Sequence, residues 1–327
     1  MATTRPLKKD KLASMSPGLA AHVALLILLP PVLACVIRKT KALMQGRPGP
    51  PFLQPVFDLA KRFGKGETVS STASWLFRAN PLVGLAVALI IAATLPWTGA
   101  EPLFKGSGAA DLILVAYLLA LARFFSVLAA LDTGSAFGGL GASREATLSV
   151  LIEPGVLVSL AAAALASGTM DLSLALETPL RSTVALLSGS AFLLAALAEL
   201  SRMPVDDPTT HLELTMIHEA TILENSGRNL ALIEVTVMLR TAVFFGLGAR
   251  LVLGSLEVWR GGGLGIGHWA LGIGPLSLMA GAILLLGFAL AAMEGIAVKL
   301  NWRRVPSFVA FSTALAVMSA FVAAVGK

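Results

Sequence analysis

The sequence predicts an all-α, polytopic membrane protein with eight transmembrane helices. Of its 327 residues, 56% are hydrophobic and only 13% are charged, whereas a soluble domain usually carries about 25% charged residues. The apolar residues gather in runs of roughly 20, the length that a helix needs to cross a bilayer. Because these runs are continuous and do not alternate with polar residues, they exclude a membrane β-barrel and favour helices.

The eight predicted spans cover most of the chain. The first run is too long for the core of a signal peptide and lacks a small-residue cleavage motif, so we expect it to be retained as a helix. We therefore expect an N-terminal tail over residues 1–17 and a single membrane domain over 18–327. The spans lie at about 18–37, 80–97, 111–131, 147–167, 180–200, 229–254, 272–293 and 305–325.

Basic residues indicate which connections face the cytoplasm. They concentrate after the odd-numbered spans, whereas the other connections hold only Lys105, Arg181 and Arg260. By the positive-inside rule the odd-numbered connections are cytoplasmic, and an even number of spans then places both termini outside. Basic residues in the N-terminal tail oppose this topology, but the larger set in the loops outweighs them. The cytoplasmic loops are expected at about 38–79, 132–146, 201–228 and 294–304.

The first cytoplasmic loop has two parts. Its GRPGPP stretch, Gly46–Pro51, cannot be helical and predicts a stiff, extended turn. The residues after it predict an amphipathic helix on the membrane interface, because apolar side chains recur at helical spacing opposite charged ones. This helix is either an ordinary surface helix or a docking site and pocket entrance, with Phe52 and Phe57 on its apolar face.

Several charged residues lie inside the predicted spans. A charge there costs roughly 2.5–3.5 kcal/mol on insertion scales, so each is a functional candidate. Arg123 could instead pair structurally with Glu153, and Arg240 with Glu234 of a neighbouring turn. We favour function for Glu153 and Glu199, which lie near cytoplasmic ends of spans. Glu153 precedes Pro154, where we expect the helix to break or bend.

A stretch from residue 199 to 227 holds six of the 19 acidic residues. Asp207-Pro208 is a natural helix start and Ser226-Gly227 a natural stop, which predicts a helix of about four turns between them. Its geometry would place Glu213 and Glu224 on one face, about 16 Å apart. Both a proton relay and a solvated acidic loop fit these residues. The six are Glu199, Asp206, Asp207, Glu213, Glu219 and Glu224.

The composition excludes several other functions. With one cysteine the chain can form no internal disulfide, CxxC metal site or iron–sulfur ligand set. His211 and His218 could bind a metal together with nearby carboxylates, but a wet helix face explains them better. The net charge of +6 reflects loop topology and not nucleic-acid binding. We therefore expect no metal, no cofactor and no independent active site in this chain.

Several motifs together resemble one family of membrane proteins. It is the H/subunit-1 family, which includes the quinone-site subunit of respiratory complex I and its relatives in membrane-bound nickel–iron hydrogenases such as formate hydrogenlyase. The resemblance covers roughly residues 18–325. The motifs are MQGRPGP with LQP (44–55), LDTGSAFGGLGASRE (131–145), LIEP (151–154), AELSRMPVDDPTTHLEL (198–214), LENSG (223–227) and MEGIAVKLNWRRVP (293–306).

The resemblance implies a membrane anchor that docks a soluble electron-transfer arm and couples redox chemistry to proton or sodium movement. It implies a path of carboxylates, Glu153, Glu199, Asp206, Glu213, Glu219 and Glu224. The supporting charges would be Arg202, Arg123, Glu145 and Asp132. The docking surface or quinone-site rim would hold Arg47, Arg144, Arg228, Phe52 and Phe57.

The resemblance also implies partners and a location. The partners would be hydrogenase-like large and small subunits and an iron–sulfur subunit, which carry the nickel–iron and iron–sulfur centres, together with antiporter-like membrane subunits. The location would be a prokaryotic cytoplasmic (inner) membrane.

The LDTGS and GASRE motifs are similar to the hydrogenase branch of the family. Val205 replaces a usual phenylalanine, Asn225 replaces a tyrosine, and the segment from Glu213 to Glu224 is about three residues longer. These departures fall where complex I holds quinone, so they argue against a quinone here. The alternatives are a quinone-binding subunit of a proton-pumping NADH:quinone oxidoreductase, a passive membrane anchor, and a secondary ion transporter. The transporter is disfavoured because the sequence shows no internal repeat.

Overall fold

A computed structural model describes residues 17–206, 216–255 and 273–326 of the chain. These residues form helices and no β-strand, and eight of the helices are long and apolar enough to cross a membrane. The predicted all-α fold with eight spans is therefore confirmed. The spans are α1 (Pro17–Met44), α3 (Trp75–Thr94), α4 (Leu112–Asp132), α5 (Ala136–Ser167), α7 (Ser182–Glu199), α9 (Gly227–Leu253), α10 (Ile273–Ile296) and α11 (Val305–Val325).

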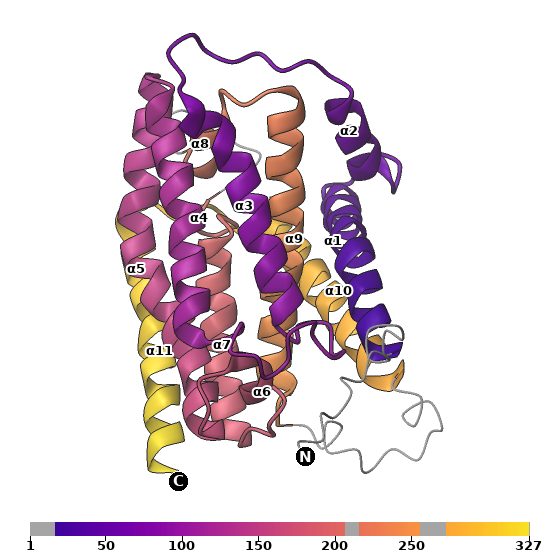
Figure 1. Cartoon of the computed structure of the whole chain (residues 1–327), viewed down its shortest axis with the longest axis vertical. Coiled ribbons are helices and arrows are strands. Elements are labelled where there is room, and N and C mark those ends of the chain that lie inside the picture. The colour runs from indigo at the N-terminus through magenta and orange to yellow at the C-terminus, as the bar shows by residue number, and fades with distance from the viewer. Residues whose placement is uncertain (1–16, 207–215, 256–272, 327) are drawn as a thin grey trace, which may run out of the picture.

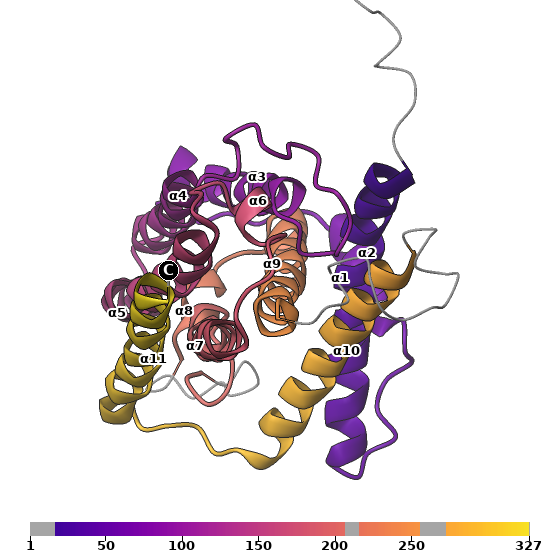
Figure 2. The same ribbon diagram turned by 90° about the horizontal axis from the view of Figure 1, so that it is seen from below.

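The spans run alternately up and down, so that α1 begins and α11 ends at the same end of the molecule (Figure 1). Figure 2 shows α1 and α10 crossing as a pair beside a bundle of the other spans, with α9 between the two groups. The short helices α2 (Gln54–Phe63) and α8 (His218–Ile222) lie at the end opposite the termini. Another short helix, α6 (Leu172–Ala175), lies at the end where α11 finishes, and a 3-10 turn (Trp302–Arg304) precedes α11.

The predicted amphipathic helix is present as α2, and five large apolar side chains on and before it are exposed. A protein surface rarely exposes so many together unless another apolar phase covers them. This pattern is typical of a helix that lies in the membrane interface. The five are Phe52, Leu53, Val56, Phe57 and Phe63.

Three span boundaries differ from the prediction. Helix α1 continues to Met44 and α3 begins at Trp75, where the Ser74 hydroxyl accepts a hydrogen bond from the Leu76 amide at 3.2 Å. The loop predicted at 132–146 shrinks to three residues, because α5 starts at Ala136 behind a Ser135 cap. A Cβ on Gly141 would come within 2.9 Å of the Ala220 side chain in α8. Glycine is needed there for close packing inside a helix.

The prediction of a four-turn helix in the acidic stretch is wrong for residues 216–226, the part of that helix that the structure describes. Met216 and Ile217 are not helical, and α8 covers only five residues. The Asp206 carboxylate accepts hydrogen bonds from the amides of Ile217 and His218, both at 3.3 Å, and so anchors a new turn just before α8. Asp207, His211 and Glu213 lie outside the described residues. The break expected at Pro154 is also absent, since α5 continues through it.

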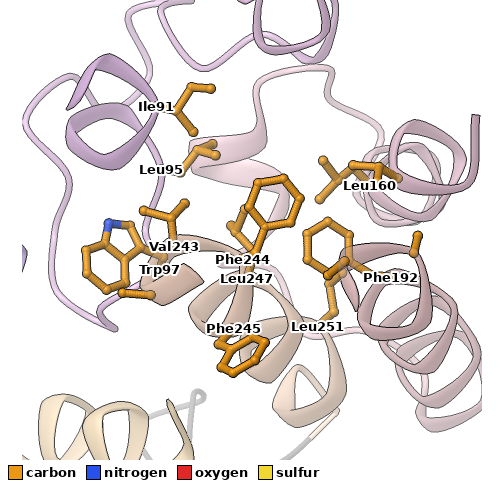
Figure 3. Close-up of a cluster of buried hydrophobic side chains, with 14 of the residues drawn as sticks. Ile91, Leu95, Trp97, Leu160, Phe192, Val243, Phe244, Phe245, Leu247 and Leu251 are labelled. Carbon is orange, nitrogen blue, oxygen red and sulfur yellow. The ribbon is translucent and has the colours of Figure 1, made fainter. Parts of the chain in front are cut away.

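The part of the apolar core between α7 and α9 lies in the half of the bundle nearer to the termini. Figure 3 shows Phe192 and Phe244 side by side in it, and their stacked rings have centroids 5.6 Å apart. Trp97 is fully buried in this core, and its indole N–H donates a hydrogen bond to the Ala92 carbonyl at 2.8 Å. The charged side chains of the candidate site therefore lie outside this core.

Candidate functional site

A buried carboxylate with two arginine partners forms the centre of the candidate site. Glu199 ends α7, and its side chain is only 2% exposed. Arg240 of α9 donates to Glu199 Oε1 at 2.6 Å, and Arg123 of α4 donates to Oε2. These two contacts bring three spans together, because Glu199 belongs to α7, Arg240 to α9 and Arg123 to α4.

A second carboxylate completes this group. Glu153 of α5 places Oε1 3.6 Å from Arg123 Nη1, which confirms the predicted pairing of these two residues. Glu145, about two turns earlier on α5, also interacts electrostatically with Arg123. Among the described residues Glu145 forms no ion pair, so its replacement by glutamine breaks none. We name Arg123, Glu153, Glu199 and Arg240 the buried ion group.

The predicted partner of Arg240 is corrected by the structure. Arg240 pairs with Glu199, and Glu234 pairs instead with Arg62 of the amphipathic helix α2. Six residues on a helix correspond to about 600°, so the two side chains point to different sides of α9. Glu234 therefore fastens α2 to the bundle.

A cavity of about 370 Å³ opens between α1, α2, α8, α9 and α10. It lies within the size range of small-molecule pockets, but such pockets are mostly apolar. Eight charged side chains, four of each sign, line this one together with apolar residues. A lining of this kind favours water and ions. The eight are Arg38, Lys41, Arg62, Arg202, Asp206, Glu219, Glu234 and Glu294.

Two further buried carboxylates hold the wall of this cavity. Asp206 pairs with Lys299 at 2.6 Å, and its side chain is 2% exposed. Glu294 of α10 lies 3.4 Å from both Lys41 of α1 and Arg202. Sequence reasoning missed Glu294 and Lys299, although both stand in the MEGIAVKLNWRRVP motif. Nothing in their local pattern shows that each pairs with a residue about 90 positions earlier in the chain.

Ion pairs also hold the amphipathic helix α2 against the bundle. Asp58 on α2 pairs with Arg38 of α1 at 2.9 Å and accepts from Gln54 at 2.8 Å. Partial burial on its own would raise the pKa of the Asp58 carboxyl. The hydrogen bonds from Gln54 and Arg38 and the charges of Arg38 and Arg62 outweigh it, so the pKa lies below its ordinary value.

The remaining predicted residues separate into surface and scaffold positions. Arg144 donates to the Met216 carbonyl at 2.8 Å and stacks over the Trp302 ring, 5.8 Å from its centroid. Asp132 accepts from the Ser74 amide at 2.6 Å and so caps α3. Glu219 lines the cavity, whereas an exposed set lies on the surface. The exposed set is Arg47, Phe52, Phe57, Glu224 and Arg228.

The LENSG motif binds the loop that follows α2. Gly227 has φ +50°, and a Cβ on it would come within 2.9 Å of the Gly66 carbonyl carbon. Ser226 accepts from the Thr68 amide and donates to the Thr68 carbonyl, both at 2.8 Å. The motif thus fixes the surface loop at the end opposite the termini.

We expect Ser226→Ala to loosen this loop, because the change removes both hydrogen bonds to Thr68. The cost should be about 1 kcal/mol, with faster amide hydrogen exchange at Thr68. Ser143→Ala, at an exposed serine of α5, should leave exchange at Thr68 unchanged. Equal exchange in the two variants would contradict the role of Ser226.

Within the described parts of the chain, no group of three or more His, Cys, Asp or Glu side chains could hold a metal ion. The acidic side chains of the buried ion group form ion pairs with basic side chains of other helices. They do not converge as the ligands of a metal ion would. What the site can do chemically is hold fixed charges, admit water and ions to a cavity, and exchange protons at carboxyl and imidazole groups.

The fold and this charged site define a membrane subunit of the complex I type. A family model described as NADH dehydrogenase matches residues 18–325, and the chain belongs to that family. The resemblance to the H/subunit-1 family noted in the motifs is therefore confirmed.

Among its relatives, hydrogenase-4 component C of Escherichia coli (strain K12) is 35% identical over 240 residues, covering 71% of this chain and 74% of the relative. Formate hydrogenlyase subunit 4 of the same organism is 34% identical over 263 residues, covering 78% and 83%. The corresponding NADH-quinone oxidoreductase subunit of Geobacillus sp. (strain WCH70) is 31% identical over 188 residues, covering 54% and 56%.

A solved structure shares the fold. A chain of the membrane-bound sulfane sulfur reductase, an archaeal respiratory membrane complex, superposes with a TM-score of 0.73 at 20% identity. The match covers 94% of this chain and 99% of that one. The relatives are thus membrane subunits of hydrogenase-4, formate hydrogenlyase and complex I, and the fold recurs in a further respiratory complex.

Proposed function

We propose that this chain is the membrane anchor and coupling subunit of a complex I-related, hydrogenase-type oxidoreductase. In this proposal it docks a soluble electron-transfer arm and links redox chemistry to the movement of protons or sodium ions. The observation that carries the proposal is the buried ion group, placed beside a charged cavity at one end of the bundle. Charges at this depth are costly and mark ion pathways in membrane proteins.

The hydrogenase branch is favoured by identity and coverage taken together. The hydrogenase-4 and formate hydrogenlyase relatives are 35% and 34% identical over 71% and 78% of this chain. The NADH-quinone oxidoreductase subunit from Geobacillus is 31% identical over only 54% of it. The partners in this proposal are hydrogenase-like large and small subunits, an iron–sulfur subunit and antiporter-like membrane subunits. The metal centres belong to those partners.

The topology of the proposal follows from the loop charges. The end that carries α2, α8 and the cavity is cytoplasmic, and both termini lie outside a prokaryotic inner membrane. The soluble arm then docks on the exposed residues of that end, among them Arg47, Glu224 and Arg228.

A quinone site is the second candidate, and one observation favours it. The cavity reaches α1 and α2, where a lipid-soluble ligand would enter from the interface. Its eight charged lining residues oppose an apolar ring, and Arg47 is exposed and does not line the cavity. We therefore assign the cavity to water and ions in this proposal.

The path in this proposal runs from the cavity acids to the small cavity beside the buried ion group, where Glu145 lies with Glu199 and Arg240. Glu145→Gln removes a titratable group without leaving an unpaired charge. We expect the number of ions moved per electron to fall at least about tenfold, because the proposed path loses one of its carboxyl groups. The measurement uses the whole complex in proteoliposomes, with its own electron donor and a dye for internal pH or sodium.

The matched control is Glu101→Gln. Glu101 is exposed at the opposite end of the bundle, so the same chemical change there should leave the ratio of ions to electrons unaltered. If Glu145→Gln keeps the wild-type ratio, Glu145 lies on no relay and the proposed coupling path is wrong.

A further inference from the structure

His218 stands where three separate cavities meet. Its side chain lines the charged cavity of about 370 Å³, a small cavity of about 20 Å³ and a third, mostly apolar cavity of about 70 Å³ between α3, α4 and α9. The small cavity also borders Glu145, Glu199 and Arg240. A cavity needs roughly 10–15 Å³ to hold one water molecule, so even the smallest has room for one. Of the described residues that line both the charged and the small cavity, His218 alone has a side chain with a nitrogen that can bind a proton.

The backbone holds His218 in place while its imidazole stays available. The His218 amide donates to Asp206 at 3.3 Å, and its carbonyl accepts from the Thr221 hydroxyl at 2.7 Å. Across the described residues, neither ring nitrogen has a hydrogen-bond partner. A half-buried imidazole with both nitrogens unused can accept a proton at one nitrogen and release one from the other.

The charges around the imidazole suit a transfer of this kind. Helix α8 packs against α4 and α5, and the facing groups combine acids with cations. Glu199 is already held by two arginines, so Glu145 is the neighbouring acid with no ion-pair partner among the described residues. The facing charged groups are Asp206, Glu145, Glu199, Glu219, Arg202 and Arg240.

We propose that His218 is the proton-transfer residue between the charged cavity and the small cavity that holds Glu145. A hydrated proton (H3O+) in the charged cavity passes its proton to one ring nitrogen and is left as water, and the ring becomes a cation. The other nitrogen then loses its proton to the Glu145 carboxylate, directly or through one water. The ring is neutral again with its proton on the opposite nitrogen, and a half-turn of the ring presents the unprotonated nitrogen to the charged cavity for the next transfer. This inference rests on the proposed coupling function and adds to it a residue and the identity of the ion, a proton.

The test uses the whole complex in proteoliposomes and compares His218→Ala with His218→Gln. We expect proton uptake per electron to fall at least about tenfold in both, the size of effect typical of losing a positioned proton-transfer group or larger. Free imidazole added to His218→Ala should restore at least part of the uptake, because the charged cavity can admit it. Imidazole should not restore Glu145→Gln, which lacks the acceptor, and Glu101→Gln serves as the unaffected control.

Two results would overturn the assignment. Wild-type proton uptake in His218→Gln shows that the imidazole is not needed. Loss of uptake in both variants with no response to imidazole shows that His218 acts only in packing.

If Glu145→Gln uncouples the complex and His218→Gln does not, this inference fails alone. If neither variant changes the ratio, the proposed function fails with it.

Discussion

Replacing Glu199 by leucine is expected to destabilise the protein by about 3–5 kcal/mol, because it leaves the buried guanidinium of Arg123 and the partly buried one of Arg240 without their shared carboxylate. Arg123 would keep only Glu153 at 3.6 Å, and Arg240 would lose its one described ion pair. The change should appear as a large fall in the unfolding midpoint of the purified complex, followed by tryptophan fluorescence during heating or denaturant titration.

The control for this effect is Glu153→Gln. The Glu153 side chain is 36% exposed and its contact with Arg123 is long, while Arg123 retains Glu199. We expect a cost of about 1 kcal/mol or less, as for other weak ion pairs. Similar losses in the two variants would show that the contacts of Glu199 with Arg123 and Arg240 contribute no more to stability than the long contact of Glu153.

A triple variant separates the charge effect from the packing effect. Combining Glu199→Leu with Arg123→Met and Arg240→Leu removes both cations along with the buried anion and leaves Glu153, whose side chain is 36% exposed. Apolar replacement of buried ion pairs is often neutral or stabilising. The triple variant should therefore recover much of the lost stability. It should not recover ion movement, because in the proposed function the charges are needed for coupling and not for folding.

The sequence was sufficient for the spans because hydropathy is a local property. In lipid, an apolar run of about 20 residues satisfies its backbone hydrogen-bonding groups by forming a helix, whichever helices surround it. The amphipathic helix α2 could be predicted for the same reason, because its apolar and charged residues alternate at helical spacing within ten residues. The sequence predicts the start of α5 too late, because the segment from Ala136 lacks a long apolar run and is helical through its packing, as at Gly141 against Ala220.

The partners of the charged residues could not be predicted from one sequence. Glu199 lies 76 positions from Arg123 and 41 from Arg240, and several other pairings fitted the same set of charges. The sequence could mark Glu199 as costly but could not show that two arginines hold it. His218 was discounted as part of a wet helix face, because only the folded chain shows that it borders three cavities.

The acidic stretch shows a further limit. Its capping residues and helical spacing fitted a single long helix, but Asp206 forms three polar interactions that start a turn before His218 instead. Each of these contacts joins residues at least eleven positions apart. A local sequence pattern contains no information on these distant contacts, so it predicts the helix that they prevent.

Substituting Gly189 of α7 by leucine should also have a large effect, about 3 kcal/mol of destabilisation from overpacking. A Cβ on Gly189 would come within 2.8 Å of the Val252 amide nitrogen and 3.0 Å of its Cα. These atoms belong to the backbone of α9, so the strain cannot be relieved by moving a side chain. The helices must separate, as at other membrane interfaces built on small residues.

The consequence reaches the candidate site, because α7 carries Glu199 and α9 carries Arg240, whose contact is 2.6 Å. We expect Gly189→Leu to lower the unfolding midpoint and to reduce ion movement together. Gly189→Ala should have a smaller effect in the same direction.

Gly281→Leu on α10 is the matched control, since a Cβ there meets no atom within 4 Å. It should be neutral or slightly stabilising, because leucine favours helix over glycine by up to about 1 kcal/mol. If Gly189→Leu and Gly281→Leu behave alike, the close approach of α7 and α9 does not set the geometry of the buried ion group. If only Gly189→Leu impairs both stability and ion movement, the core between α7 and α9 positions charges that lie more than two helical turns away from it.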